Sequence, residues 1–240
     1  MLLVPLFRQD LIRWLPHGLA IAEIGVAEGE FSAKILDTCV PERLYLIDAW
    51  EHQSVGHLAA DPNNPNADEQ RARYEGVLAR FDKQISDDRV SIMRAFSHVA
   101  AREFADGSLD VIYVDGDHSY DGVSRDLETF APKLRNGGLI FGHDYTQLEV
   151  MGFGVIEAVN DFVLRTGFKF LALTTFDPFP TFVIAAQQIG LASQFTRAII
   201  ENVRGVVELA RYPVGYSYSP KYIQRPSGTL GIVQSFRLGD

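Results

Sequence analysis

The sequence has little that would suit an oxidising compartment or a membrane. Its 240 residues include one cysteine, Cys39, so no internal disulfide can form, and we expect this thiol to pack within an apolar helical stretch. No apolar run approaches the roughly 18 residues that cross a bilayer. The apolar start, MLLVPLF, is interrupted by Pro5 and lacks a basic leader and a small-residue cleavage site, so no signal peptide is predicted. These absences predict a cytoplasmic protein with no membrane partner.

A long basic run is missing as well. Asp and Glu number 31 against 22 Lys and Arg, which gives a net charge of −9. Nucleic-acid binding normally requires clustered Lys and Arg that neutralise phosphates, so we expect no nucleic-acid partner. The length, with 47% hydrophobic and 22% charged residues, fits one large α/β domain that can bury its own core.

Apolar, β-rich runs alternate along the chain with segments of helical periodicity. This alternation predicts an α/β fold with a doubly wound, mostly parallel, seven-stranded sheet and helices on both faces. Several of the runs are apolar throughout, as expected for strands that are buried on both faces. The strand candidates are residues 20–24, 43–47, 89–94, 109–114, 138–141, 169–174 and 181–185.

The segments outside this alternation predict the domain organisation. Residues 1–186 are expected to form the main domain. Within it, residues 55–68 form a Pro-, Asn- and Asp-rich insertion, either a lid or substrate loop or a plain surface excursion, and a helix follows over residues 68–85. Residues 187–240 read as a C-terminal extension, an amphipathic helix followed by a Tyr- and Pro-rich tail, docked on the domain or on another subunit. The helix is expected to carry Phe195, Ile199, Val203, Val206 and Ala210.

A glycine turn follows the first of the main strands, in the order strand, turn, helix. Glu23 leads into Gly25 and Gly29, and glycine allows backbone N–H groups to approach a ligand closely. Asp48 ends the next strand, where a carboxylate is placed to accept hydrogen bonds from both hydroxyls of a ribose. The spacing Gly-x-x-x-Gly, with Ala27 between, disfavours a dinucleotide cofactor, which would need Gly-x-Gly-x-x-Gly.

The pattern Glu23-x-Gly25-x-x-x-Gly29 resembles motif I of class I methyltransferases. The resemblance implies a Rossmann-like class I methyltransferase fold and S-adenosylmethionine as cofactor. It implies that Glu23, Gly25 and Gly29 contact the methionine part of this cofactor and that Asp48 holds its ribose. It also places Phe96 and Ser97 beside the adenine ring, although Phe96 as a core residue and Ser97 as a helix N-cap are equally good readings.

Acidic and histidine side chains follow two further strand candidates, at Asp115, Asp117 and His118 and at His143 and Asp144. Ligands of open parallel sheets bind beyond the carboxyl ends of the strands, and both groups fall there. Carboxylates and imidazoles gathered at one place favour a divalent metal, and we expect Mg²⁺ or Mn²⁺, although His143 as a ligand would shift the preference toward Mn²⁺, Fe²⁺ or Zn²⁺. Asp117 or His118 is the candidate general base. The alternatives are helix capping by Asp117 or Ser119, a structural role for His118, and loop hydrogen bonding alone for His143 and Asp144.

The stretch that contains both groups resembles small-molecule O-methyltransferases, including macrocin-type and mycinamicin-type sugar methyltransferases and relatives described as cephalosporin hydroxylases. The resemblance implies metal binding at Asp115, which we also count among the cofactor contacts, and at an acidic pair that matches His143 and Asp144. The base corresponds to Asp117 in some relatives and to His118 in others. This sequence departs from the pattern because His143 replaces an acid, which puts the identity of the metal and the need for it in question.

Together these features predict methyl transfer from S-adenosylmethionine to a hydroxyl of a small molecule, assisted by a divalent metal. A metal-independent methyltransferase and a non-catalytic binding or assembly protein on the same fold are the alternatives. The apolar helix near Phe195 makes a homodimer a further expectation. The acceptor cannot be read from a fold and a cofactor loop.

Overall fold

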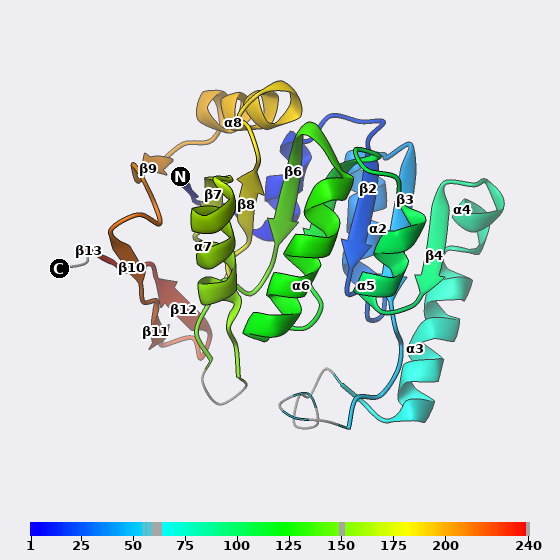
Figure 1. Cartoon of the computed structure of the whole chain (residues 1–240). Coiled ribbons are helices and arrows are strands. Elements are labelled where there is room, and N and C mark those ends of the chain that lie inside the picture. Colours follow the sequence, from blue (N-terminus) through cyan, green and yellow to red (C-terminus); the bar gives the residue numbers. More distant parts are fainter. Residues whose placement is uncertain (55, 57, 59–63, 149–151, 239–240) are drawn as a thin grey trace.

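The computed structural model describes residues 1–54, 56, 58, 64–148 and 152–238 as one α/β unit (Figure 1). Of the predicted insertion 55–68, residues 55, 57 and 59–63 lie outside the described residues. The strands of the main sheet are β1 (Leu2–Val4), β2 (Ala20–Ile24), β3 (Arg43–Asp48), β4 (Val90–Arg94), β5 (Leu109–Val114), β6 (Leu134–Gly142), β7 (Lys169–Thr174), β8 (Phe182–Ala185) and β9 (Val207–Glu208). The α-helices are α1 (Arg8–Leu11), α2 (Glu30–Cys39), α3 (Ala67–Arg80), α4 (Asp82–Ser86), α5 (Ser97–Ala100), α6 (Tyr120–Phe130), α7 (Val155–Thr166) and α8 (Gly190–Asn202).

The strands lie in the order β4-β3-β2-β5-β6-β8-β7-β1-β9. Strands β4, β3, β2, β5 and β6 are parallel neighbours, whereas β8 runs antiparallel to both β6 and β7. The chain builds outward from β2 in one direction and from β5 in the other, so the order reverses between these two strands. In open α/β sheets such a switch point leaves a crevice at the carboxyl ends of the strands.

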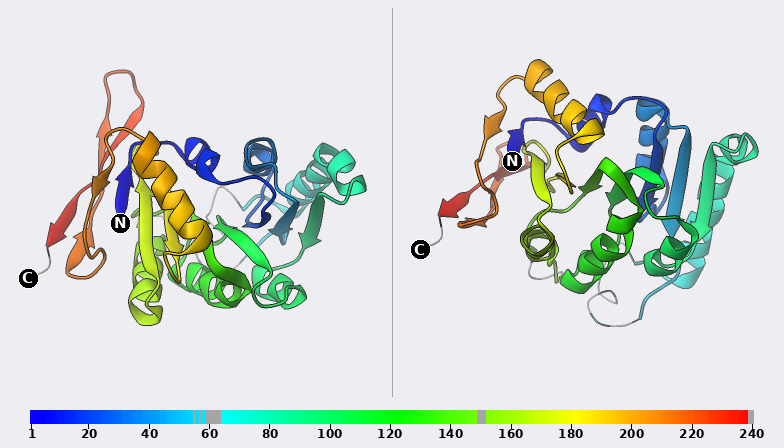
Figure 2. Two further views of the ribbon diagram at one scale, coloured as in Figure 1. Left: turned by 90° about the horizontal axis from the view of Figure 1, so that it is seen from above. Right: turned by 45° about the horizontal axis from the view of Figure 1, so that its top comes forward.

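Helices cover both faces of the sheet, and successive strand residues alternate between the two layers (Figures 1 and 2). Val111 and Tyr113 of β5 pack with α2, α3 and α8, whereas Ile112 and Val114 pack with α5, α6 and α7. Cys39 at the end of α2 is fully buried, which confirms the packed thiol. No helix among the described residues is both long and apolar enough to span a membrane.

The expected strand count of seven was too low, because β1 and β9 extend the sheet beyond β7. β1 has three residues and pairs in parallel with β7 through Leu2↔Ala172 and Val4↔Thr174. β9 has two residues and pairs with the far side of β1. Strands this short have no detectable periodicity, and partners so far apart in sequence are set by tertiary packing.

The C-terminal helix ends earlier than its apolar pattern suggested. α8 buries Ala192, Phe195 and Ile199 but stops at Asn202, because Val203 is already extended. Val206 and Ala210 therefore lie beyond the helix. The tail that follows forms two small antiparallel pairs at the β7 side of the molecule (Figure 2). Their strands are β10 (Tyr216–Tyr218) with β13 (Phe236–Leu238), and β11 (Lys221–Gln224) with β12 (Leu230–Val233).

Candidate functional site

The glycine turn lies directly against the end of β5. Gly25 has φ +85°, and a Cβ there would lie 2.0 Å from the carbonyl oxygen of Asp115. Gly29, with φ +73°, begins α2, and its Cβ would lie 2.9 Å from the ring of Phe81. Only glycine permits this approach and this left-handed backbone without strain. The turn therefore brings its backbone to the switch point between β2 and β5.

Asp48 lies at the end of β3 and holds the glycine turn. Its Oδ2 accepts hydrogen bonds from the N–H groups of Val26 (2.9 Å) and Ala27 (3.0 Å). Its Oδ1 accepts from the N–H of Trp50 (2.8 Å), and the Trp50 indole N–H donates to the carbonyl of Ala27 (2.9 Å). Trp50 is buried and supports the turn from one side. The carboxylate is thus fixed at the sheet edge where a ribose is expected.

Glu23, predicted as a cofactor contact, is buried beneath the turn rather than displayed on it. Only 1% of the residue is exposed, and the Ser32 hydroxyl of α2 donates a hydrogen bond to its Oε2. Burial raises the pKa of Glu23 to about 8, although the hydrogen bond from Ser32 opposes that rise. At neutral pH the side chain is therefore a protonated acid that ties β2 to α2.

Phe96 and Ser97 follow β4, next to the end of β3. The backbone N–H of Ala95 donates to the carbonyl of Asp48 (3.0 Å), which brings the two strand ends together. Phe96 is 40% exposed and stacks on His98, so its ring is accessible to a ligand. The Ser97 hydroxyl instead donates to the buried carboxyl of Asp126, so it already has an acceptor.

Four side chains from the ends of β5 and β6 meet at one place. We call Asp115, His118, His143 and Asp144 the strand-end cluster. Nε2 of His118 lies 3.0 Å from Oδ2 of Asp144 and 3.9 Å from Oδ1 of Asp115. Nδ1 of His143 lies 3.2 Å and 3.7 Å from the same two oxygens. Two imidazoles thus face one oxygen from each carboxylate.

The charges of the strand-end cluster are strongly coupled. Burial lowers the pKa of His118, but Asp115 and Asp144 outweigh it and raise that pKa to about 10. The pKa of His143 is raised in the same way, with burial opposing the attraction of the carboxylates. Burial works to raise the pKa of Asp144, but both histidines hold it well below its usual range. The cluster therefore favours an ionised Asp144 beside imidazolium groups.

Asp117 does not join the strand-end cluster. Its Oδ1 accepts the backbone N–H of Ser119 (2.9 Å), and the Ser119 hydroxyl accepts from Gly122 (3.0 Å) as the N-cap of α6. A Cβ on Gly122 would lie 2.3 Å from the Asp117 carboxyl carbon, so Asp117 packs on the first turn of that helix. Of the two candidate bases, only His118 faces the other cluster residues.

Arg8, from the short helix α1, is a site residue that the sequence did not reveal. Its guanidinium donates to Oδ2 of Asp115 (2.9 Å) and lies 4.5 Å from the ring centroid of Phe31. Its backbone N–H donates to Oδ2 of Asp177 (2.6 Å), before β8. Nothing in the local pattern around residue 8 marks this role, because its partner lies 107 positions away in the sequence.

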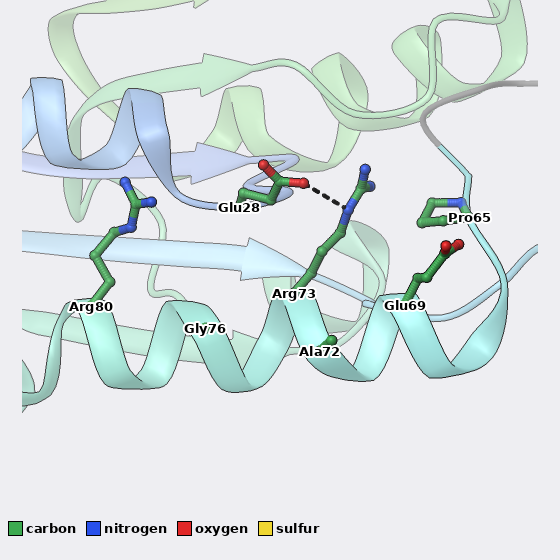
Figure 3. A pocket seen from close by; sticks show the side chains of 7 residues that line it. All are labelled: Glu28, Pro65, Glu69, Ala72, Arg73, Gly76 and Arg80. Atoms are coloured by element: carbon green, nitrogen blue, oxygen red, sulfur yellow. Dashed lines mark ion pairs between the residues drawn. The ribbon is translucent and has the colours of Figure 1, made fainter.

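A cavity of about 620 Å³ lies between the glycine turn and α3, but Gly25, Gly29 and Asp48 are not among its lining residues (Figure 3). Glu28 of the turn and Arg73 of α3 face each other across it, with a contact of 3.4 Å between Oε1 and Nε. Its remaining lining residues are Pro65, Glu69, Ala72, Gly76 and Arg80. Since none of these was expected to bind cofactor or metal, the cavity adds no support to those assignments.

Comparison with known proteins identifies the central part of the chain. Residues 22–145, more than half of the chain, match a family described as "Methyltransferase domain". The uncharacterised protein y4gI of Sinorhizobium fredii is 33% identical over 149 residues, which make up 59% of this chain and 15% of that protein. The chain thus spans only a small part of that relative's length.

Solved structures share the fold at low sequence identity. A proposed methyltransferase from Streptococcus mutans, in complex with SAH, is 11% identical, with 73% of this chain and 93% of that chain covered at a TM-score of 0.50. An O-methyltransferase family protein from Burkholderia thailandensis is 13% identical, with 74% and 54% covered at a TM-score of 0.50. A proposed rRNA methylase from Clostridium thermocellum is 13% identical, with 74% and 92% covered at a TM-score of 0.50. Identities this low establish the fold alone, and the acceptors of these proteins differ.

Proposed function

Because this chain belongs to the methyltransferase-domain family, we propose that it transfers a methyl group from S-adenosylmethionine to a hydroxyl of a small molecule. Its sheet has the class I methyltransferase fold, extended by β1 and β9. The observation that carries the proposal is the convergence of two features at one switch point. The glycine turn presses on the backbone of Asp115, and the side chain of that same residue belongs to the strand-end cluster. A donor site and an acceptor site therefore adjoin.

The donor site is proposed to lie along the ends of β2, β3 and β4. Gly25 and Gly29 would let the backbone approach the methionine part, and Asp48 would accept the ribose hydroxyls. The exposed ring of Phe96 would contact the adenine, with Ser97 beside it. We also assign Glu23 and Asp115 to the donor site. Glu23 supports the glycine turn from beneath, and Asp115 borders the donor.

Methyl transfer depends chiefly on aligning the acceptor oxygen with the methyl group. The strand-end cluster would hold the acceptor hydroxyl beside the donor, and Arg8 fixes Asp115 through a charge-assisted hydrogen bond. His118 is our candidate for the group that takes the hydroxyl proton, since Asp117 packs on α6. It must first lose the proton that its carboxylate neighbours stabilise.

The donor set of the strand-end cluster fits a divalent cation. Ligand atoms of Asp115, His118 and Asp144 lie within 4.8 Å of one another, and His143 faces the same oxygens. We assign Asp115, His143 and Asp144 as the ligands and leave His118 as the base, and a set that includes an imidazole suits Mn²⁺ better than Mg²⁺. A cation held there would lower the pKa of an acceptor hydroxyl.

Replacing Asp48 with alanine should weaken S-adenosylmethionine binding by about 10-fold to 100-fold, because hydrogen bonds to a charged acceptor each contribute about 1.5–3 kcal/mol. Isothermal titration calorimetry on the full chain measures the affinity. Asp110→Ala is the matched control, since Asp110 also accepts a backbone N–H (from Ala20, 2.8 Å), but at the opposite end of β2. Equal affinities in Asp48→Ala and the wild type would remove the ribose assignment.

Replacing Asp144 with asparagine should weaken Mn²⁺ binding by about 100-fold or more, since even outer partners of metal ligands contribute 10-fold to 100-fold. Titration of Mn²⁺ followed by electron paramagnetic resonance measures this directly. Asp121→Asn, at an exposed position in the first turn of α6, is the control and should bind as the wild type does. EDTA should abolish turnover, and Mg²⁺ or Mn²⁺ should restore it.

Two other functions remain to be separated from this one. Full turnover in EDTA, with no Mn²⁺ bound, would indicate a metal-independent methyltransferase. S-adenosylmethionine binding without turnover on any hydroxyl acceptor would indicate a binding or assembly protein. From the sequence alone we also propose a cytoplasmic location, no nucleic-acid or membrane partner, a homodimer, and a domain boundary at residue 186.

A further inference from the structure

Four phenylalanines lie on segments that contact the strand-end cluster, either directly or through Arg8. They come from three segments far apart in the sequence, and we call Phe7, Phe153, Phe176 and Phe179 the phenylalanine rim. We propose that this rim binds an aromatic ring, so that the acceptor is an aromatic compound bearing a hydroxyl, such as a phenol. The inference rests on the proposed methyl transfer and names its substrate class.

Phe7 and Phe176, one half of the phenylalanine rim, lie next to residues that bond to each other, Arg8 and Asp177. Phe7 and Phe176 contact edge to face, with ring centroids 5.6 Å apart, yet they are 41% and 54% exposed. The backbone between them is fixed, because the N–H of Arg8 donates to Asp177 (2.6 Å). The guanidinium of the same Arg8 donates to Asp115. This exposed aromatic pair is therefore continuous with the strand-end cluster.

The other half contacts the histidines. The ring centroid of Phe153 lies 4.7 Å from that of His118, and the N–H of Gly154 donates to the carbonyl of His118 (2.9 Å). The ring centroid of Phe179 lies 6.5 Å from that of His143. Both imidazoles thus have an aromatic neighbour as well as the carboxylates that they face.

The polar residues beside the phenylalanine rim, Arg8 and Asp177, favour an acceptor with few hydroxyls. Arg8 and Asp177 already bond to one another, and Asp177 also accepts from the Thr174 hydroxyl (3.3 Å). A sugar needs a polar partner for each of several hydroxyls, whereas a phenol needs one partner and an apolar wall. Aromatic rings pack edge to face or offset against phenylalanines, and doing so would cover the exposed faces of Phe7 and Phe176.

The transfer on such an acceptor balances without a further reactant. The phenolic oxygen bonds to the methyl carbon as the carbon–sulfur bond breaks, and that electron pair stays on sulfur to give S-adenosylhomocysteine. The phenolic proton passes to neutral His118. The product is an aryl methyl ether.

The test compares acceptor classes on the full chain with S-adenosylmethionine and Mn²⁺ by following S-adenosylhomocysteine and identifying products by mass spectrometry. Phenols and catechols should be methylated at least about tenfold faster, in kcat/KM, than monosaccharides and aliphatic alcohols. Phe176→Ala should raise KM for the phenol about tenfold, which corresponds to about 1.4 kcal/mol, and leave kcat within about twofold, since the lost aromatic contact binds substrate and transition state alike. Phe176→Tyr should keep the wild-type KM.

Ile200→Ala is the control, because Ile200 is an apolar residue of α8 that is 58% exposed and lies outside the rim. Its KM should match the wild type. Preferred methylation of sugars, or equal KM values for Phe176→Ala and Ile200→Ala, would overturn the aromatic acceptor and leave the methyltransferase proposal intact. Failure to bind S-adenosylmethionine, with no transfer to any acceptor class, would instead reject the proposed function.

Discussion

Replacing Gly25 with alanine should lower the free energy of unfolding by more than about 3 kcal/mol and abolish S-adenosylmethionine binding. The left-handed backbone at φ +85° alone costs an L-residue about 1–2 kcal/mol. The added Cβ would also lie 2.0 Å from the carbonyl oxygen, 2.4 Å from the carbonyl carbon of Asp115 and 2.7 Å from the nitrogen of Gly116. These are backbone atoms at the end of a central strand, so they cannot move aside as a flexible side chain could. The turn must lift away from β5, and the donor site is lost with it.

Gly18→Ala separates the clash from the backbone strain. Gly18 has φ +78°, but no heavy atom lies within 4 Å of the position that its Cβ would take. Its variant should therefore lose only about 1–2 kcal/mol and bind S-adenosylmethionine as the wild type does. Urea unfolding gives the stabilities, and calorimetry gives the affinities. Similar losses in the two variants would show that the contact with Asp115 is not what requires glycine at position 25.

The parts of the fold that the sequence predicted are those governed by local pattern. Five parallel strands, including β2 at residues 20–24 and β5 at residues 109–114, were found because strands buried on both faces are apolar throughout. The glycine turn was recognisable because its geometry requires glycine at fixed positions. The fold class followed from the alternation of strands and helices.

What the sequence could not predict depends on contacts between distant segments. β1 forms only through its pairing with β7, and Arg8 reaches the site only because α1 lies beside α2 and the end of β5. The choice between Asp117 and His118 depends on how the backbone turns into α6, which two adjacent polar residues do not reveal. Spacing placed both in the same loop, but Asp117 packs on the first turn of α6 while His118 turns to Asp144.

Replacing Glu23 with glutamine should have little effect on stability near pH 5 and should stabilise the protein strongly at pH 9. Burial raises the pKa of Glu23 to about 8 in the folded state from an ordinary value of 4.5. Below pH 4.5 both the folded and the unfolded chain hold the proton. Between 4.5 and 8 the unfolded chain releases it while the folded chain keeps it, so the stability of the wild type falls as pH rises. Above pH 8 the loss approaches about 5 kcal/mol, because each pKa unit corresponds to about 1.4 kcal/mol.

Glutamine avoids this loss because it cannot ionise, and its amide oxygen can still accept the hydrogen bond from Ser32. Thermal unfolding from pH 5 to pH 9 measures the gap between variant and wild type, which should widen as pH rises. Asp126, whose buried carboxyl has its pKa raised to about 7, changes stability in the same direction in both proteins, so the difference between them isolates Glu23. Glu75→Gln, at an exposed position of α3, should show a constant small gap. A gap for Glu23→Gln that stays equally constant would mean that Glu23 is ionised in the folded protein. The acid beneath the glycine turn would then carry a charge towards the donor site instead of supporting the turn as a neutral group.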